Sequence, residues 1–227
     1  MKHIDLFVNI KSLYMNDTPK IIAFDGTAAS GKGTIAKIVA KKFSFDYLDT
    51  GKLFRKIAYL YLLKKHNIQF NIVIKNYNFF EFNNVNSKFL FTDLISNTAS
   101  YLAQDLLIRT FIQKKQKEFV REKKIVVIDG RDIGTVVFPD AEIKFFFDAN
   151  LEVRSKRRFK QLHNKVNNIT LGGVLKNLRT RDIRDKNRLI APLVSSKDSI
   201  NIDTTLPTIN AILKQIVYKI NKKLNTQ

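Results

Sequence analysis

The stretch FDGTAASGKGT, from Phe24 to Thr34, has the glycine and lysine spacing of a loop that holds a phosphate. In the pattern G-x-x-x-x-G-K-[ST], backbone N–H groups surround the anion, the lysine reaches its outer oxygens, and a hydroxyl contacts a metal ion. Here Gly33 stands where the hydroxyl belongs, and Thr34 follows one position later. The alternative is a glycine-containing turn without a ligand. Because the loop lies between a strand-like run and a helix-like segment, we favour phosphate binding.

Arginine is the second group of residues that could do chemistry. Only 11 of the 40 basic residues are arginine, and a guanidinium grips a phosphate with two hydrogen bonds where lysine acts as a point charge. Three of them stand singly after apolar segments: Arg55, Arg109 and Arg131. Six more form two groups, one of Arg154, Arg157 and Arg158 and one of Arg181, Arg184 and Arg188. A lone arginine is more often paired with a nearby carboxylate, but this grouping favours phosphate.

Five short apolar runs indicate the strands that must position these residues, and an aspartate follows each run. The runs are Lys20–Phe24, Phe45–Leu48, Ile125–Ile128, Ile143–Phe147 and Ser199–Ile202, and the aspartates are Asp25, Asp49, Asp129, Asp148 and Asp203. Continuous apolar runs of this length are typical of parallel strands that are covered on both faces. Some of the aspartates are expected only to cap the turn or helix that follows.

Helix-length segments separate the runs and complete the fold prediction. They are Gly31–Phe43, Lys52–Lys65, Asp93–Glu122, which is long enough to be broken, and Thr208–Leu224. Strands alternating with helices predict an α/β fold with a doubly wound, five-stranded parallel sheet. Ligands of such folds bind beyond the carboxyl ends of the strands, which is where the phosphate loop and the aspartates would lie.

Composition limits the class of protein. The net charge of +20 attracts anions, but the lysines are scattered, and codon choice in an AT-rich genome explains the abundance of Lys, Ile and Asn. We therefore expect no specific nucleic-acid partner. The absence of cysteine excludes disulfides and thiolate metal sites. No apolar run reaches the roughly 18 residues of a membrane span, and no secretory signal is recognisable, so we expect a cytoplasmic protein.

The chain is expected to form one domain over residues 20–227, preceded by an N-terminal extension over residues 1–19. Met15 is an alternative start, which mass analysis of the native protein would identify. Residues 66–92 are rich in Asn, Phe and Ile and alternate between apolar and polar, which predicts a small β-rich insert.

Four blocks of sequence resemble the signature blocks of bacterial cytidylate kinases, which are nucleoside monophosphate kinases. The blocks are GTAASGKGT, LDTGKLFR, IDGRDIGTVVFPDA and RDIRDKNRLIAPL, and they follow one another in the family order from about Lys20 onward. GKGT, with glycine after the lysine, is the usual loop form of this family. The resemblance implies a P-loop kinase, a monomer, that transfers the γ-phosphate of ATP to CMP or dCMP with the help of Mg²⁺.

The resemblance assigns the ATP-binding residues to the phosphate loop and the lid. They are Gly26, Thr27, Ala28, Ala29, Ser30, Gly31, Lys32, Gly33, Thr34, Arg157 and Arg158. Thr34 and Asp129 are the implied metal contacts, partly through water. The implied catalytic residues are Lys32, Arg131, Arg188 and Asp129. Ala29 stands where relatives often have a third glycine.

The resemblance also assigns the acceptor site. The implied CMP-binding residues are Thr50, Arg55, Ser100, Arg109, Arg131, Asp132, Arg181, Asp185 and Arg188. A carboxylate such as Asp185 accepts from the exocyclic amine of cytosine, and Arg181 or Ser100 can donate to its ring. From the residues alone, the favoured interpretation is that Asp185 forms an ion pair with Arg181 or Arg188 on a charged helix face. Phe54 replaces a tyrosine that is common in the family, so a contact from that hydroxyl is lost.

Residues 152–173 resemble the mobile helical lid of these kinases, whose closure would exclude water from the reacting phosphate. The insert on the acceptor side is shorter than in familiar members, which bears on how tightly the base is enclosed. Two other functions are weighed against this one: a P-loop kinase for AMP or shikimate, and a basic nucleic-acid-binding protein, whose binding would be strongly salt-sensitive.

Overall fold

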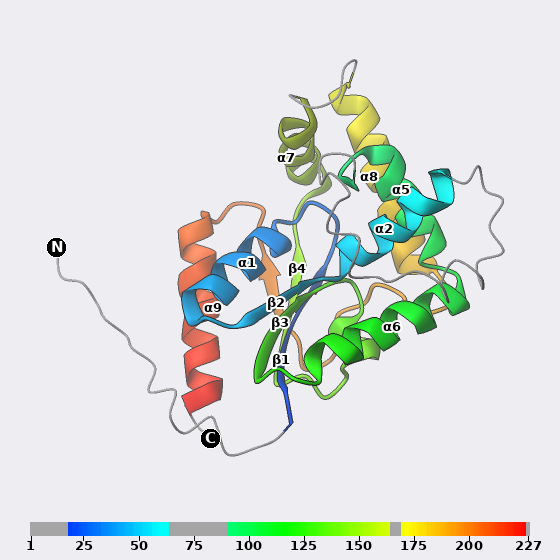
Figure 1. Cartoon of the computed structure of the whole chain (residues 1–227). Helices are drawn as coiled ribbons and strands as arrows, with labels where there is room; N and C mark the ends of the chain where they lie inside the picture. Colours follow the sequence, from blue (N-terminus) through cyan, green and yellow to red (C-terminus); the bar gives the residue numbers. More distant parts are fainter. Residues whose placement is uncertain (1–17, 64–89, 164–168, 226–227) are drawn as a thin grey trace.

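A five-stranded parallel sheet forms the centre of the computed structural model, which describes residues 18–63, 90–163 and 169–225 (Figure 1). The strands lie in the order β2-β3-β1-β4-β5, and every neighbouring pair is parallel. Their bounds are β1 Lys20–Gly26, β2 Asp46–Asp49, β3 Ile125–Asp129, β4 Ile143–Asp148 and β5 Ile200–Asp203. All five strands predicted from apolar runs are present, which confirms the doubly wound α/β fold.

Helices cover both faces of the sheet and extend beyond its carboxyl edge (Figure 1). Their bounds are α1 Lys32–Phe43, α2 Thr50–Leu63, α5 Asp93–Leu102, α6 Leu106–Val120, α7 Leu151–His163, α8 Leu171–Asn187 and α9 Ile209–Asn225, with a π-helical turn, η3, at Ile133–Val137. The long predicted helix from Asp93 is indeed broken. Asp105 begins its second half by accepting a hydrogen bond of 2.9 Å from the backbone N–H of Ile108.

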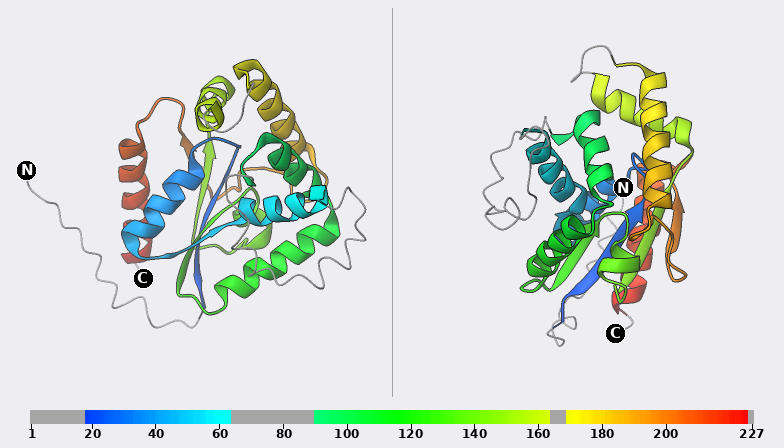
Figure 2. Two further views of the ribbon diagram at one scale, coloured as in Figure 1. Left: turned by 45° about the horizontal axis from the view of Figure 1, so that its top comes forward. Right: turned by 90° about the vertical axis from the view of Figure 1, so that its right-hand side faces the viewer.

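The main core lies between the sheet and the layer formed by α1 and α9. The aromatic rings of Phe24, Phe145 and Phe147 fill its centre, and α1 and α9 contribute aliphatic side chains such as Ile35 and Ile216. A second apolar cluster covers the opposite face, where η3 and the end of α6 pack on β1 and β3. Figure 2 shows these layers from two further sides. Burial on both faces explains why β1 and β3 are apolar almost throughout.

Two smaller clusters carry the elements beyond the sheet. One joins α2, α5 and α6, and the other joins α7, α8 and Ala28 of the phosphate loop. The predicted lid segment, residues 152–173, covers most of α7 and the start of α8, with residues 164–168 outside the described part. The predicted extension, residues 1–19, and insert, residues 66–92, fall almost wholly on residues that the structure does not describe. The division into a domain, an extension, an insert and a lid therefore stays a prediction.

The sheet register brings the predicted aspartates together at one edge. Asp49 lies beside Asp129 on neighbouring strands, and Asp148 lies beside Asp203. Such closely spaced carboxylates need cations or hydrogen-bond donors to offset their repulsion. The carboxyl edge of the sheet is therefore the place where basic side chains must gather.

Gly26 ends β1 at a point where two backbones approach closely. Its φ is +142°, and a Cβ added there would collide with the carbonyl oxygen of Phe147 on β4. The next residue, Thr27, donates its backbone N–H to that same oxygen at 3.0 Å. Glycine is thus required at the start of the phosphate loop for both its conformation and its lack of a side chain.

We expect Gly26→Ala to lower the free energy of unfolding by about 3 kcal/mol or more, because it adds backbone strain to a backbone collision. Denaturant unfolding followed by circular dichroism measures this loss. Gly172→Ala, in the first turn of α8, is the matched control, since nothing lies within 4 Å of a Cβ there. Alanine favours helix, so the control should be as stable as the wild type or slightly more so. Equal stability of the two variants would contradict the close approach at Gly26.

Candidate functional site

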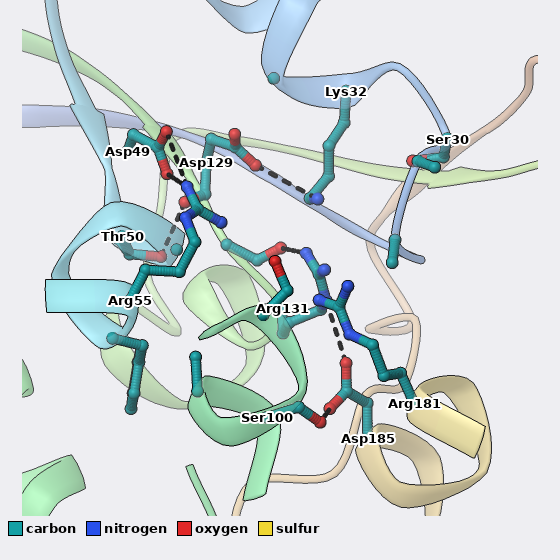
Figure 3. Close-up of a pocket in the computed structure, with 18 of the residues that line it drawn as sticks. Ser30, Lys32, Asp49, Thr50, Arg55, Ser100, Asp129, Arg131, Arg181 and Asp185 are labelled. Atoms are coloured by element: carbon teal, nitrogen blue, oxygen red, sulfur yellow. Dashed lines mark hydrogen bonds and ion pairs between the residues drawn. The ribbon is translucent and has the colours of Figure 1, made fainter. Parts of the chain in front are cut away.

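A cavity of about 490 Å³ opens at the carboxyl edge of the sheet, where ligands of doubly wound folds bind. It is lined by the phosphate loop, the ends of β2 and β3, and side chains of α2, α5, α7 and α8. Figure 3 shows Lys32 at one end of this cavity and Asp185 at the other. The predicted site residues that line it are Ala28, Ala29, Ser30, Gly31, Lys32, Gly33, Thr34, Thr50, Arg55, Ser100, Asp129, Arg131, Asp132, Arg158, Arg181, Asp185 and Arg188.

Four predicted residues do not line the cavity. Gly26 and Thr27 form the start of the phosphate loop outside the cavity, and the Thr27 hydroxyl donates to the carboxylate of Asp148 at 2.7 Å. Arg109 is buried behind the cavity wall, and Arg157 turns away toward the loop after β5. Of these four residues, Arg109 is bonded to the cavity residues Asp132 and Ala103, and Thr27 to Ser30.

The phosphate loop is held in shape by hydrogen bonds from the rest of the protein. Its carbonyl oxygens accept from three side chains: Ser30 donates to Thr27 at 2.9 Å, Thr204 to Ser30 at 2.7 Å, and Arg154 to Ala28 at 3.2 Å. Arg154 belongs to the predicted lid, yet it is only 5% exposed, so it is not part of a solvated helix face. The loop is thus shaped before any ligand arrives.

Ala29, where relatives often have glycine, adopts a left-handed conformation with φ of 60°. Alanine is disfavoured in this region relative to glycine. The methyl group is partly buried, however, against the apolar cluster formed by Ala28, Leu162, Val174 and Leu178. The side chain therefore joins the loop to α7 and α8, and this packing offsets the backbone cost.

The absence of a side chain at Gly33 leaves room for the carboxylate of Asp129. Asp129 forms an ion pair with Lys32, with its Oδ1 3.4 Å from Nζ, and its Oδ2 lies 2.6 Å from where a Cβ on Gly33 would stand. A serine or threonine at position 33 would therefore collide with Asp129. The displaced hydroxyl of the sequence pattern has a steric cause: the strand-end carboxylate comes directly against the start of α1.

Lys32 is buried at the base of the cavity, where its surroundings act on its pKa in opposite directions. Burial lowers the pKa of Lys32 to about 8, and the neighbouring Arg131 acts in the same direction, while Asp129 and Asp49 oppose both. An added phosphate would favour the charged form of this lysine, because it brings negative charge to within reach of Nζ.

Tyr47 was missed by the sequence interpretation, and Asp49 was expected only as a strand-end aspartate, yet both line the cavity. The Tyr47 hydroxyl donates to Asp129 Oδ2 at 3.3 Å, and burial together with the nearby carboxylates raises the pKa of this phenol. Asp49 accepts from Arg55 through both carboxylate oxygens at 3.3 Å. Asp49 is the second residue of the block LDTGKLFR and Tyr47 directly precedes this block, which was the available signal.

The donor set at this end fits a magnesium ion that arrives with a nucleotide. Within the described residues, no group of three or more His, Cys, Asp or Glu side chains could hold a metal ion by itself. Asp129 offers one carboxylate, and Thr34 offers an exposed hydroxyl at the cavity wall. Mg²⁺ is typically held in this way, by one or two protein oxygens together with phosphate oxygens and water.

Asp185 lies at the other end of the cavity, held by two donors. Its carboxylate accepts from the Ser100 hydroxyl at 2.8 Å and from Nε of Arg131 at 3.3 Å (Figure 3). Burial acts to raise the pKa of Asp185, but the charges of Arg131 and Arg181 outweigh it and hold the pKa below its ordinary value. Asp185 is therefore an ionised acceptor inside a nearly closed wall.

Arg181 faces the same space without a hydrogen-bond partner of its own at Nε, which is buried. Burial lowers the pKa of Arg181 to about 10, and other arginines add to the effect. A buried donor without a partner is costly. Arg181, like Arg55 with its own unpartnered Nε, is thus able to donate to an anionic or acceptor group of a ligand.

Asp132 holds two further arginines. Its Oδ2 forms a short ion pair with Arg109, and its Oδ1 lies 3.4 Å from Nη2 of Arg188. Arg188 lines the cavity, while Arg109 is 2% exposed and also donates to the carbonyl of Ala103 at 3.1 Å. Arg109 therefore contacts Asp132 from behind the cavity wall.

The two arginines of the predicted lid that were assigned to ATP binding, Arg157 and Arg158, bond to different neighbours. Arg157 donates to the hydroxyl and carbonyl oxygens of Thr204 at 3.1 and 2.6 Å. Arg158 forms an ion pair of 3.0 Å with Asp93 and donates to the carbonyl of Phe91 at 2.7 Å. The ring of Phe91, which sequence interpretation missed, lies 4.5 Å from the guanidinium of Arg55. Arg158 thereby links α7 to the acceptor end of the cavity.

Comparison with solved structures supports the fold. A protein called TT1252 from Thermus thermophilus matches with a TM-score of 0.53 at 15% identity, over 91% of this chain and 98% of that one. At this identity the likeness concerns the fold alone. In the described part of the chain, no helix has both the length and the apolar character needed to cross a membrane.

Comparison with known sequences supports the family. The cytidylate kinase family model matches residues 22–222. A cytidylate kinase of Clostridioides difficile (strain 630) is 41% identical over 212 residues, which are 88% of this chain and 98% of the relative. A cytidylate kinase of Mycoplasmoides gallisepticum is 40% identical over 213 residues, 89% of this chain and 94% of the relative. The chain therefore belongs to the cytidylate kinase family.

Proposed function

We propose that this protein transfers the γ-phosphate of ATP to CMP or dCMP, which gives ADP and CDP or dCDP. One observation carries the proposal: a single cavity holds a phosphate loop at one end and the Asp185 carboxylate, with its donors Ser100 and Arg131, at the other. The cytidylate kinases that the chain resembles support the choice of acceptor. The proposal includes a monomer, as the resemblance implies, and the nucleotide substrates support a place in the cytoplasm.

The donor triphosphate binds on the phosphate loop, residues 26–34. Backbone N–H groups at the start of α1 and the positive end of its dipole favour phosphate there. Lys32 offsets the negative charge of the phosphoryl group that is being transferred. Phosphoryl transfer needs positioning and charge stabilisation more than a covalent nucleophile. Asp129 and Thr34 would hold Mg²⁺. A magnesium ion held there would supply positive charge to offset the negative charge that develops on the phosphates.

The acceptor phosphate binds among Thr50, Arg55, Arg131 and Arg188. Thr50 is fixed by a 2.7 Å hydrogen bond from its hydroxyl to the carbonyl of Asp129, which ties it to the metal side of the cavity. Arg131 stands between the two ends of the cavity, so it can contact both the acceptor phosphate and the transferring group. The cationic wall also raises the local concentration of an anionic acceptor.

Cytosine is read by Asp185, Arg181 and Ser100. The Asp185 carboxylate accepts from the exocyclic amine, and Arg181 donates to a ring acceptor. Uracil presents a carbonyl where cytosine has the amine, so it would leave a buried carboxylate facing an acceptor. Arg157 and Arg158 bind the donor once the lid closes over it and excludes water from the reacting phosphate.

The acceptor profile tests this function directly. In a coupled assay that follows ADP formation with ATP and Mg²⁺, we expect CMP and dCMP to be used at least about tenfold more efficiently than UMP, because one mispaired buried group costs at least one factor of ten. AMP and shikimate, offered in the same assay, should be poorer still. Equal or better turnover of AMP than of CMP would overturn the base assignment.

Asp185→Ala tests how the base is read. We expect kcat/KM for CMP to fall by about a hundredfold and the preference for CMP over UMP to shrink by about tenfold, because the amine loses its acceptor. Asp198→Ala is the control, since Asp198 is an exposed carboxylate that pairs with Lys144 away from the cavity. An unchanged ratio of CMP to UMP use in Asp185→Ala would show that this residue does not read the base.

Gly33→Ser tests the displaced hydroxyl. The variant restores the plain phosphate-loop pattern, yet we expect kcat/KM for ATP to fall by about tenfold or more, because the new Cβ forces Asp129 off Lys32. Steady-state kinetics measure the loss, and thermal unfolding of the same variant shows whether the fold is retained. Activity at or above that of the wild type would mean that Asp129 moves freely and that its closeness to Gly33 has no function.

A further inference from the structure

We propose that Asp25 is a positioning residue for acceptor binding: from the end of β1 it caps the η3 turn and so holds Arg131 and Asp132 in place. The inference rests on the proposed function, in which these two residues belong to the acceptor site. Asp25 was expected from the sequence only as one of five strand-end aspartates. It does not line the cavity.

The contact between Asp25 and η3 uses both carboxylate oxygens. Oδ1 accepts from the backbone N–H of Ile133 at 2.9 Å, and Oδ2 accepts from the backbone N–H of Gly134 at 2.7 Å. Asp25 is 5% exposed and lies more than a hundred residues away along the chain from the turn that it binds. The start of a helical turn has N–H groups without internal partners, so a carboxylate there is a cap.

Asp132 occupies the position from which this turn would ordinarily be capped. It precedes Ile133 directly, yet its side chain makes no capping hydrogen bond. Its carboxylate instead pairs with Arg109 and Arg188. Asp25 therefore supplies the cap from a distant strand, and this leaves Asp132 available to hold the two arginines.

The burial of Asp25 is costly, and the turn offsets part of this cost. Burial raises the pKa of Asp25 to about 7, and Asp132 acts in the same direction, while the two backbone N–H groups and Lys32 act to lower it. Two short hydrogen bonds to a charged acceptor are among the stronger ones in proteins. The contact thus fixes η3 firmly to β1.

Loss of the cap should affect the two substrates unequally. The turn would shift, and with it Arg131 and the carboxylate that holds Arg188. The phosphate loop begins only one residue after Asp25, but its shape also depends on hydrogen bonds from Arg154 and Thr204, which a change at Asp25 leaves in place. Acceptor binding should therefore weaken more than donor binding.

The experiment compares Asp25→Ala and Asp25→Asn with the wild type by steady-state kinetics. We expect the KM for CMP to rise by roughly tenfold or more in Asp25→Ala, since displacements of about 1 Å have effects of this size or larger, while the KM for ATP stays within about threefold. Asparagine keeps the shape and one acceptor, so Asp25→Asn should lie between. Thr208→Ala is the matched control: it removes the Thr208 cap of α9, remote from the cavity, and should change neither KM.

The outcomes separate the two proposals. A wild type that does not phosphorylate CMP overturns the proposed function, and the acceptor role of Asp25 with it. An active wild type whose Asp25 variants show equal rises in both KM values, or no rise for CMP, overturns the role of Asp25 alone. If Asp25→Ala does not fold, Asp25→Asn gives the same comparison. Failure of both to fold would overturn a positioning role, because Asp25 would then be required by the core.

Discussion

Repulsion between buried guanidinium groups is the constraint on which the whole cavity depends. Burial lowers the pKa of both Arg55 and Arg188, and nearby arginines act in the same direction. Such a cluster of guanidinium groups is stable only if carboxylates are interleaved with it. Asp49, Asp132 and Asp185 supply that charge. The pairing leaves Arg181 with a buried Nε that has no partner. A phosphate-bearing ligand completes the balance, so the site is assembled before the substrate arrives yet still attracts it.

The fold meets this constraint by bringing strand ends and helix starts to one edge. Parallel strands end side by side, so Asp49 at the end of β2 lies directly beside Asp129 at the end of β3. The α8 helix then carries Arg181 and Asp185 to the far wall of the cavity. Capping is shared in an unusual way, since Asp25 binds the turn that Asp132 would otherwise cap. Structural carboxylates thereby release others for pairing with the arginines.

Much of this architecture could be predicted from the sequence, because strands, helices and the phosphate loop are local patterns. The apolar runs predicted all five strands, and the loop Phe24–Thr34 lies where expected between β1 and α1. The long-range contacts could not be predicted in this way. Phe91 reaches Arg55, and Arg154 reaches Ala28, only because distant segments pack together. No spacing rule along the chain encodes such pairs, whereas local alternation and glycine spacing encode the elements themselves.

The two departures of the phosphate loop from a plain pattern have a common origin in what packs against it. Position 33 favours glycine because Asp129 packs against the start of α1, and its Oδ2 lies 2.6 Å from where a Cβ of residue 33 would stand. Ala29 has a side chain, despite its left-handed backbone, because its methyl group packs against α7 and α8 from above. A loop that only bound phosphate would favour glycine at position 29 and a hydroxyl at position 33. The residues found there instead bring the loop into contact with the strand-end carboxylate and with α7 and α8, so the position of the loop depends on both.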